Sequence, residues 1–329
     1  MRTLFRIIIF LIPLIAMLSA AFAESDIPDG SSPVINQAQF AEHVFQKGMT
    51  PEIIGITVYS ILMYLVLLSG VIIFLIYVLS GSFSKNIKGI PTVPWKMVFA
   101  MKSLFLMIVL SMAVQMVFGI LKNHGLLEEA PSMIIQMVVS QMVIVLVICA
   151  FAYDAYKKYS WKIIELFKNN RKKAFLSGFA AYLGCYPLFF ILGMLTKALA
   201  KVLNFRLDLQ PVVSSIKDIS SAWQLCVYIV LFVIIAPVIE EIFFRGIIYR
   251  GCKSSMGVWP AAFLSAFLFS AIHTSFLGFL PIFGLGIAFA YIYEKAGSLC
   301  APIFFHALYN AVSFTGAFLL YQLLEVLPE

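Results

Sequence analysis

The stretch APVIEEIFFRG, from Ala236 to Gly246, places two adjacent carboxylates and a guanidinium near the end of an apolar run that begins at about Leu225. A run of this length and character predicts a membrane-spanning helix. An ionised side chain at the centre of such a helix costs roughly 2.5–3.5 kcal/mol on insertion scales, so acidic residues there indicate a functional site. This stretch therefore predicts both a membrane protein and the position of its polar centre.

The three charged residues of the stretch differ in the partners that they can reach. Glu241 and Arg245 are four residues apart, so on a helix they lie on one face, where they can neutralise each other and support the charge balance of the site. Glu240 points about 100° away around the helix. Its partners must therefore come from other helices. The downstream polar residues that can serve are His273, His306 and Asn310.

The composition is that of a polytopic membrane protein. Of the 329 residues, 62% are hydrophobic and 12% are charged, and the mean hydropathy is +0.99, whereas a soluble domain carries about 25% charged residues. The net charge of +7 is concentrated in particular loops. This pattern indicates membrane orientation and contact with anionic lipid rather than nucleic-acid binding. The five cysteines are scattered singly, without a CxxC pair, and are expected to be small core residues.

The N-terminus has the three parts of a secretory signal: a basic start, an apolar stretch over residues 7–18, and a small-x-small site at Ala21–Ala23. We expect a cleaved signal peptide over residues 1–23, in preference to an uncleaved signal anchor. Residues 24–52 are polar and are expected to form an exported, loosely ordered segment.

Apolar runs predict an all-α transmembrane bundle of about eight spans in the mature chain. Residues 53–224 are expected to form four supporting helices with their loops, and residues 225–325 a functional core of four helices, because the intramembrane polar residues gather there. Pro281 is expected to open the seventh span. The predicted spans cover about residues 53–79, 97–120, 134–153, 174–195, 225–250, 261–280, 281–293 and 302–325.

The basic residues predict the orientation of the bundle. The densest basic run, from Lys157 to Lys173, follows the third span, so the positive-inside rule places it in the cytoplasm. Counting back by alternation places Glu24 outside, in agreement with the signal peptide. We therefore expect a multipass protein of the bacterial inner membrane, with Glu240 in the inner half of its helix and anionic lipid at the basic loop.

The polar groups of the core suit the hydrolysis of an amide by an activated water. Glu240 is the candidate general base, a role worth about 10²–10⁴-fold in rate. His273 can orient the same water or protonate the leaving amine. His306 and Asn310, four residues apart on one helix face, can donate hydrogen bonds to the developing oxyanion.

Three motifs in order resemble those of a known family. Glu-Glu-x-x-x-Arg, then Phe-x-x-x-His, then His-x-x-x-Asn is similar to the pattern of the CAAX prenyl endopeptidase and bacteriocin-processing family, also called Abi or Rce1-like intramembrane proteases. The motif residues are Glu240, Glu241, Arg245, Phe269, His273, His306 and Asn310. The resemblance covers about residues 225–324 and implies a glutamate-dependent membrane endopeptidase.

The resemblance also implies roles for the motif residues. Glu240 and His273 would position the water, and His306 and Asn310 would form the oxyanion site. The substrate would be a membrane-associated or lipidated peptide that reaches the site from the cytoplasmic side or laterally. No cofactor is expected.

Three other functions stay open at this point. In a zinc hydrolase, His273, His306 and one glutamate would be ligands and the other glutamate the base, although the HExxH pattern is missing. In a bacteriocin-immunity or binding protein the same fold would act without cleavage, and Glu240→Gln would leave the phenotype intact. A proton-coupled transporter would also use intramembrane Glu and His, but no repeat of the first half is seen.

Overall fold

The computed structural model describes residues 50–79, 89–126, 129–167, 171–203, 216, 219 and 221–326. The predicted signal peptide, and nearly all of the predicted external segment 24–52, lie outside the described residues. Within the described ranges the secondary structure is helical and contains no strand. The prediction of an all-α bundle is confirmed.

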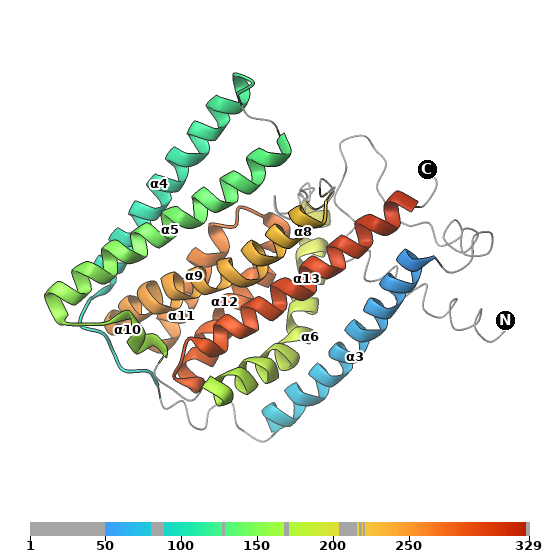
Figure 1. The fold of residues 1–329 in the computed structure, drawn as a ribbon. Helices are drawn as coiled ribbons and strands as arrows, with labels where there is room; N and C mark the ends of the chain where they lie inside the picture. The colour runs from blue at the N-terminus through green and yellow to red at the C-terminus, as the bar shows by residue number, and fades with distance from the viewer. Residues whose placement is uncertain are drawn as a thin grey trace.

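The first half of the chain supplies four long helices. They are α3 (Pro51–Leu79), α4 (Met97–Asn123), α5 (Glu129–Tyr159) and α6 (Arg171–Leu203), with the short 3₁₀ helix η1 (Ile163–Phe167) between α5 and α6. α4 and α5 form a hairpin whose far end projects away from the other helices (Figure 1).

The second half begins with one long helical unit made of five pieces. These are α8 (Ala222–Tyr228), η3 (Ile229–Ile235), α9 (Ala236–Glu241), η4 (Ile242–Tyr249) and α10 (Arg250–Met256). Three further helices follow: α11 (Val258–Ala271), α12 (Phe276–Ala296) and α13 (Cys300–Val326). α12 packs against α6 and α11, while α13 packs against α6 and α3 (Figure 1).

Seven helical units in the described part of the chain are long and apolar enough to cross a membrane. They are α3, α4, α5, α6, the five-piece unit, α12 and α13. The protein is therefore a multipass membrane protein. The predicted sixth span corresponds to α11, which has only 14 residues. Its length of about 20 Å is shorter than the hydrocarbon core of about 30 Å.

The break between the sixth and seventh helices differs from the prediction. Residues 272–275, which we call the reversal, separate α11 from α12, so Pro281 lies inside α12 and does not open it. Thr274 adopts a φ of 48° in the reversal, and Gly278 N donates to Ser275 Oγ at 3.0 Å. The N-cap serine sets the start of α12, because it satisfies a free backbone donor, whereas a proline is tolerated inside a membrane helix when its neighbours protect the freed carbonyl.

One end of the core is closed by a network that the sequence analysis did not predict. Glu294, only 1% exposed, accepts hydrogen bonds from Tyr249 Oη at 2.6 Å and from Lys253 Nζ at 2.7 Å. We call these three residues the clamp. Its carboxylate also accepts from Ile90 N at 2.8 Å, so the clamp fixes the connecting segment, residues 89–96, across the ends of α10 and α12.

Candidate active site

The two glutamates lie on a short α-helical piece between two π-helical pieces, η3 and η4. A π turn is rare and often marks a functional site. Pro237 gives a local reason for the first one, because proline lacks an N–H and its ring collides with the carbonyl four residues earlier. That carbonyl belongs to Val233, inside η3. The wide turn relieves this collision and sets the direction from which α9 presents its carboxylates.

Glu241 and Arg245 form the ion pair that their spacing predicted. Arg245 Nη1 lies 3.0 Å from Glu241 Oε1, and both side chains are 0% exposed. Arg245 Nη2 also donates to Gly286 O at 3.3 Å. The guanidinium faces the rings of Phe269 at 4.4 Å and Phe289 at 4.9 Å. These cation–π contacts help to hold the charge in an apolar interior.

His306 lies between the two carboxylates. Its Nδ1 is 3.0 Å from Glu241 Oε1, and its Nε2 is 3.8 Å from Glu240 Oε2. Because the paired Glu241 oxygen is an acceptor, His306 Nδ1 carries the proton and donates it to that oxygen. The ring stacks on Phe289, with centroids 4.9 Å apart and planes at 26°. Nε2 is thereby directed at Glu240.

His273 lies in the reversal and joins the same group. Its Nδ1 is 2.7 Å from Phe269 O. A carbonyl oxygen only accepts, so Nδ1 donates and Nε2 is the ring nitrogen left for a further partner. His273 interacts electrostatically with Glu240, Arg245 and His306. The structure therefore brings together polar residues from the five-piece unit, the reversal and α13, which lie far apart in the sequence.

Glu240 differs from Glu241 in how firmly it is held. Glu241 is enclosed and bonded by Arg245 and His306, whereas the Glu240 side chain is 15% exposed and meets His306 only at 3.8 Å. A carboxylate that is partly open and not engaged by a cation can accept a hydrogen bond from water. Of the two, Glu240 is the one placed to act as a base.

Asn310 lies one turn beyond His306, as its spacing predicted, but it has a different partner. Its Nδ2 donates to Phe232 O at 3.0 Å. The side chain, which is 7% exposed, therefore joins α13 to η3. Its oxyanion role stays a prediction, and in this arrangement it positions the helix that carries His306.

The zinc-hydrolase alternative has no preformed ligand set. Among the residues that the structure describes, no group of three or more His, Cys, Asp or Glu side chains is placed to hold a metal ion. The Nδ1 atoms of His273 and His306 both act as hydrogen-bond donors, which removes one ring nitrogen of each from coordination.

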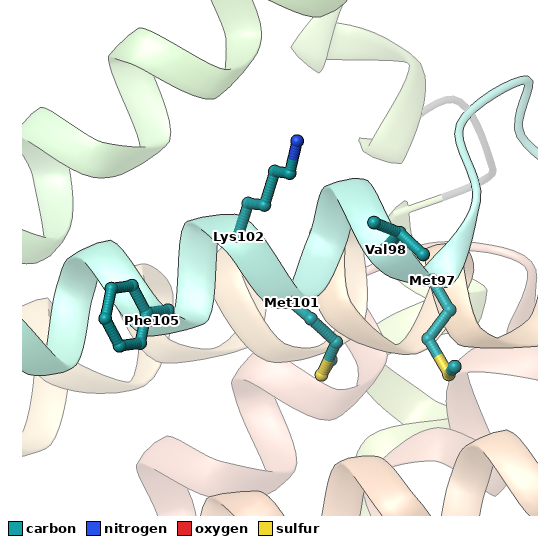
Figure 2. A pocket seen from close by; sticks show the side chains of 5 residues that line it. All are labelled: Met97, Val98, Met101, Lys102 and Phe105. Atoms are coloured by element: carbon teal, nitrogen blue, oxygen red, sulfur yellow. The ribbon is translucent and has the colours of Figure 1, made fainter.

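A pocket on α4 lies apart from this group. Five residues line it, all from α4: Met97, Val98, Met101, Lys102 and Phe105 (Figure 2). Val98 is 64% and Phe105 70% exposed, as expected for a helix face that meets lipid. The pocket contains none of the polar residues around Glu240, so we do not assign the chemistry to it.

α12 contributes to the site although it carries none of the three motifs. Gly286 supplies the carbonyl that accepts from Arg245, and Phe289 stacks on His306. A Cβ on Gly286 would lie 2.7 Å from Ala266 Cβ, so the glycine permits α11 and α12 to approach closely. Gly284, two residues earlier, faces the other neighbour of α12: a Cβ there would lie 2.5 Å from Leu192 Cδ1 of α6.

Comparison with known proteins matches the segment that carries this site to a known family. Residues 222–312 match the family described as type II CAAX prenyl endopeptidase Rce1-like. The matched segment contains all three motifs, and the resemblance inferred from them is confirmed.

Two curated relatives are similar over part of the same region. The chain is 30% identical to "Putative membrane peptidase YdiL" of Bacillus subtilis (strain 168) over 77 residues, which is 23% of this chain and 32% of that protein. It is 37% identical to "UPF0177 protein YaiF" of Lactococcus lactis subsp. lactis (strain IL1403) over 86 residues, which is 25% of this chain and 36% of that protein. The matches thus span about a third of the length of these relatives. No solved structure matches the chain.

Proposed function

We propose that the protein is an intramembrane endopeptidase in which Glu240 activates water for hydrolysis of a peptide bond. The observation that carries the proposal is the grouping of a partly open carboxylate with two histidines whose Nδ1 atoms are fixed as donors. The match of this segment to a membrane peptidase family supports the same reaction.

In the proposed reaction Glu240 takes a proton from water as the water oxygen bonds to the scissile carbonyl carbon. His273 Nε2 accepts a hydrogen bond from the same water and fixes its direction. His306 already donates from Nδ1 to Glu241, so its Nε2 donates to the oxyanion only when the ring is doubly protonated. In that form His306, together with Asn310, is the candidate for stabilising the oxyanion. When the C–N bond breaks, the leaving amine takes the proton from Glu240, which returns the carboxylate to its first state.

The substrate class follows from the surroundings of Glu240. The site lies inside a bundle of membrane helices, so the substrate is a membrane-associated or lipidated peptide. Lys157 and Lys158 at the end of α5 are exposed, and we propose that they contact anionic lipid at the cytoplasmic face of a bacterial inner membrane.

The test is cleavage of a quenched peptide library, including lipidated peptides, by the purified full chain in bilayers. We expect Glu240→Gln and His273→Ala each to lower the rate by about 10²-fold or more, while chelators leave wild-type cleavage unchanged. Glu165→Gln, which changes a carboxylate in η1 outside the site, is the matched control and retains activity.

Equal cleavage by wild type and both site variants would show that Glu240 is not the base. Wild-type cleavage that chelators abolish would favour the zinc hydrolase instead. If no peptide is cleaved and Glu240→Gln also leaves the cellular phenotype intact, the non-catalytic immunity or binding function takes its place.

A further inference from the structure

The depth at which the reversal lies in the membrane bears on how water and substrate reach Glu240. α11 begins beside Trp259, which stacks on Tyr291 of α12 with centroids 6.4 Å apart. Lys295 Nζ donates to Tyr291 Oη at 3.2 Å. Trp, Tyr and Lys gather at membrane interfaces, so this end of α11 marks one surface of the bilayer.

From that surface α11 extends only 14 residues, about 20 Å, before the chain turns back. The hydrocarbon core is about 30 Å thick, so the reversal lies within it. The last carbonyl groups of a helix have no partner inside the helix; those of α11 are bonded by the reversal itself, Ser270 O by His273 N and Ala271 O by Thr274 N. Irregular backbone at membrane depth is tolerated only where protein buries it or where it lines a water-filled cavity.

The reversal is not fully covered by protein. Thr274 is exposed and Phe276, which follows the reversal, is 39% exposed, while His273 is partly exposed. Protein thus leaves one side of the reversal open, and because irregular backbone that faces lipid alone is not tolerated at this depth, water is expected to reach that side. The same water would then reach the Nε2 atom of His273.

The opposite end of the core is closed. The clamp holds the connecting segment, whose Trp95 is 1% exposed and packs edge-on against Phe151 at 5.1 Å and Trp161 at 4.9 Å. Beside it, Leu299 N donates to Leu166 O at 3.0 Å, which fastens η1 to the start of α13. Two connections of the supporting helices therefore cover the clamp end.

Along the five-piece unit, too, the residues next to the clamp are the most continuously buried. From Phe243 to Cys252, next to the clamp, every residue is buried, whereas Glu240 is 15% exposed at its side chain and Ile234 is 54% exposed. Glu240 thus lies between a partly exposed stretch and the continuously buried stretch that begins at Phe243. The open side of the site faces away from the clamp.

We propose that water and substrate reach Glu240 through the reversal, from the half of the membrane opposite the clamp. In the predicted orientation this is the external half. The substrate is then a membrane-inserted peptide segment rather than a C-terminus offered from the cytoplasm. This inference rests on the proposed function for its substrate, but the route itself does not require catalysis.

Thiol labelling tests the route in the full chain after its five natural cysteines are replaced. Thr274→Cys is exposed to an impermeant cationic thiol reagent in oriented vesicles, and Phe267→Cys is the matched control. Phe267 is 51% exposed on α11, and we expect it to face lipid, where a thiol does not ionise. We expect Cys at 274 to react at least about tenfold faster, and only from the external side, while Leu166→Cys stays unreacted.

Labelling of Leu166→Cys with no reaction at position 274, or reaction at 274 from the clamp side alone, would overturn the route.

For the substrate, a hydrophobic peptide inserted in the same bilayer is compared with a lipidated peptide added at the clamp side. Cleavage of the inserted peptide supports the proposal, and cleavage of the lipidated peptide alone contradicts it. If Thr274→Cys reacts as expected in a Glu240→Gln background but wild type cuts neither peptide, the route stands and the protease proposal fails.

Discussion

At the scale of single residues, the site depends on how Arg245 is compensated. Its charge is balanced by Glu241, by one carbonyl and by three aromatic rings, with no exposure to solvent. Burying two charges is costly, and a buried pair is strongly destabilised when one partner is removed. Arg245 is therefore a positioning residue, which fixes Glu241 and through it His306.

Arg245→Met is expected to destabilise the fold by about 3–5 kcal/mol, because it leaves the Glu241 carboxylate buried without its cation. The measurement is unfolding of the purified protein in detergent. Adding Glu241→Gln should restore much of the lost stability without restoring cleavage. A single variant as stable as wild type would show that Glu241 is not held as a carboxylate.

The spacing of four residues was enough to predict the Glu241–Arg245 pair, because both residues belong to one helix. It was not enough to predict that His306 Nδ1 also donates to Glu241, since 65 positions separate them. For Asn310, spacing along the helix was likewise not enough to predict its partner. Its place on the face of His306 was predictable, but its bond to Phe232 O required the position of another helix.

At the scale of elements, the close contact of α11 and α12 brings two groups into one site: His273 and the Gly286 carbonyl that accepts a hydrogen bond from Arg245. Gly286 makes this contact possible, because any larger residue would meet Ala266. The predicted helix boundaries near this contact were wrong by several residues. The reason is that Pro281 was interpreted as a helix start, whereas the N-cap at Ser275 decides it.

Gly286→Ala is expected to cost about 1–3 kcal/mol, because its Cβ overpacks the interface with Ala266 and displaces the carbonyl that binds Arg245. Thermal unfolding in detergent is the measurement. Gly193→Ala in α6 is the control: its Cβ meets nothing within 4 Å, and removal of a helix glycine should stabilise by about 0.5–1 kcal/mol. If both variants change stability equally, the α11–α12 contact is not close.

At the scale of the whole molecule, the first four helices contribute more than support. Their connecting segments close one end of the functional core through the clamp and through Trp95. Lys253 is bonded to Glu294, with its side chain 8% exposed, because the connecting segment folds over it.

Thiol labelling of two loops tests the predicted orientation of the bundle in the membrane. Leu126→Cys, 69% exposed between α4 and α5, should react with an impermeant thiol reagent in intact cells. Ser160→Cys, exposed between α5 and η1, should react only after the membrane is permeabilised, because the positive-inside rule places the basic run in the cytoplasm. The opposite pattern would invert the bundle and place the reversal toward the cytoplasm.

The sequence by itself determined the class of fold and the family that the chain resembles, and it predicted the residues of the candidate site. Apolar runs, basic loops and three motifs act locally along the chain, so composition and spacing suffice to recognise them. Only the tertiary structure decided that His306 lies between both carboxylates, that Glu240 is the more open of the two glutamates, and that the clamp closes one end. These features depend on the relative positions of helices, which side-chain packing determines and local periodicity does not encode.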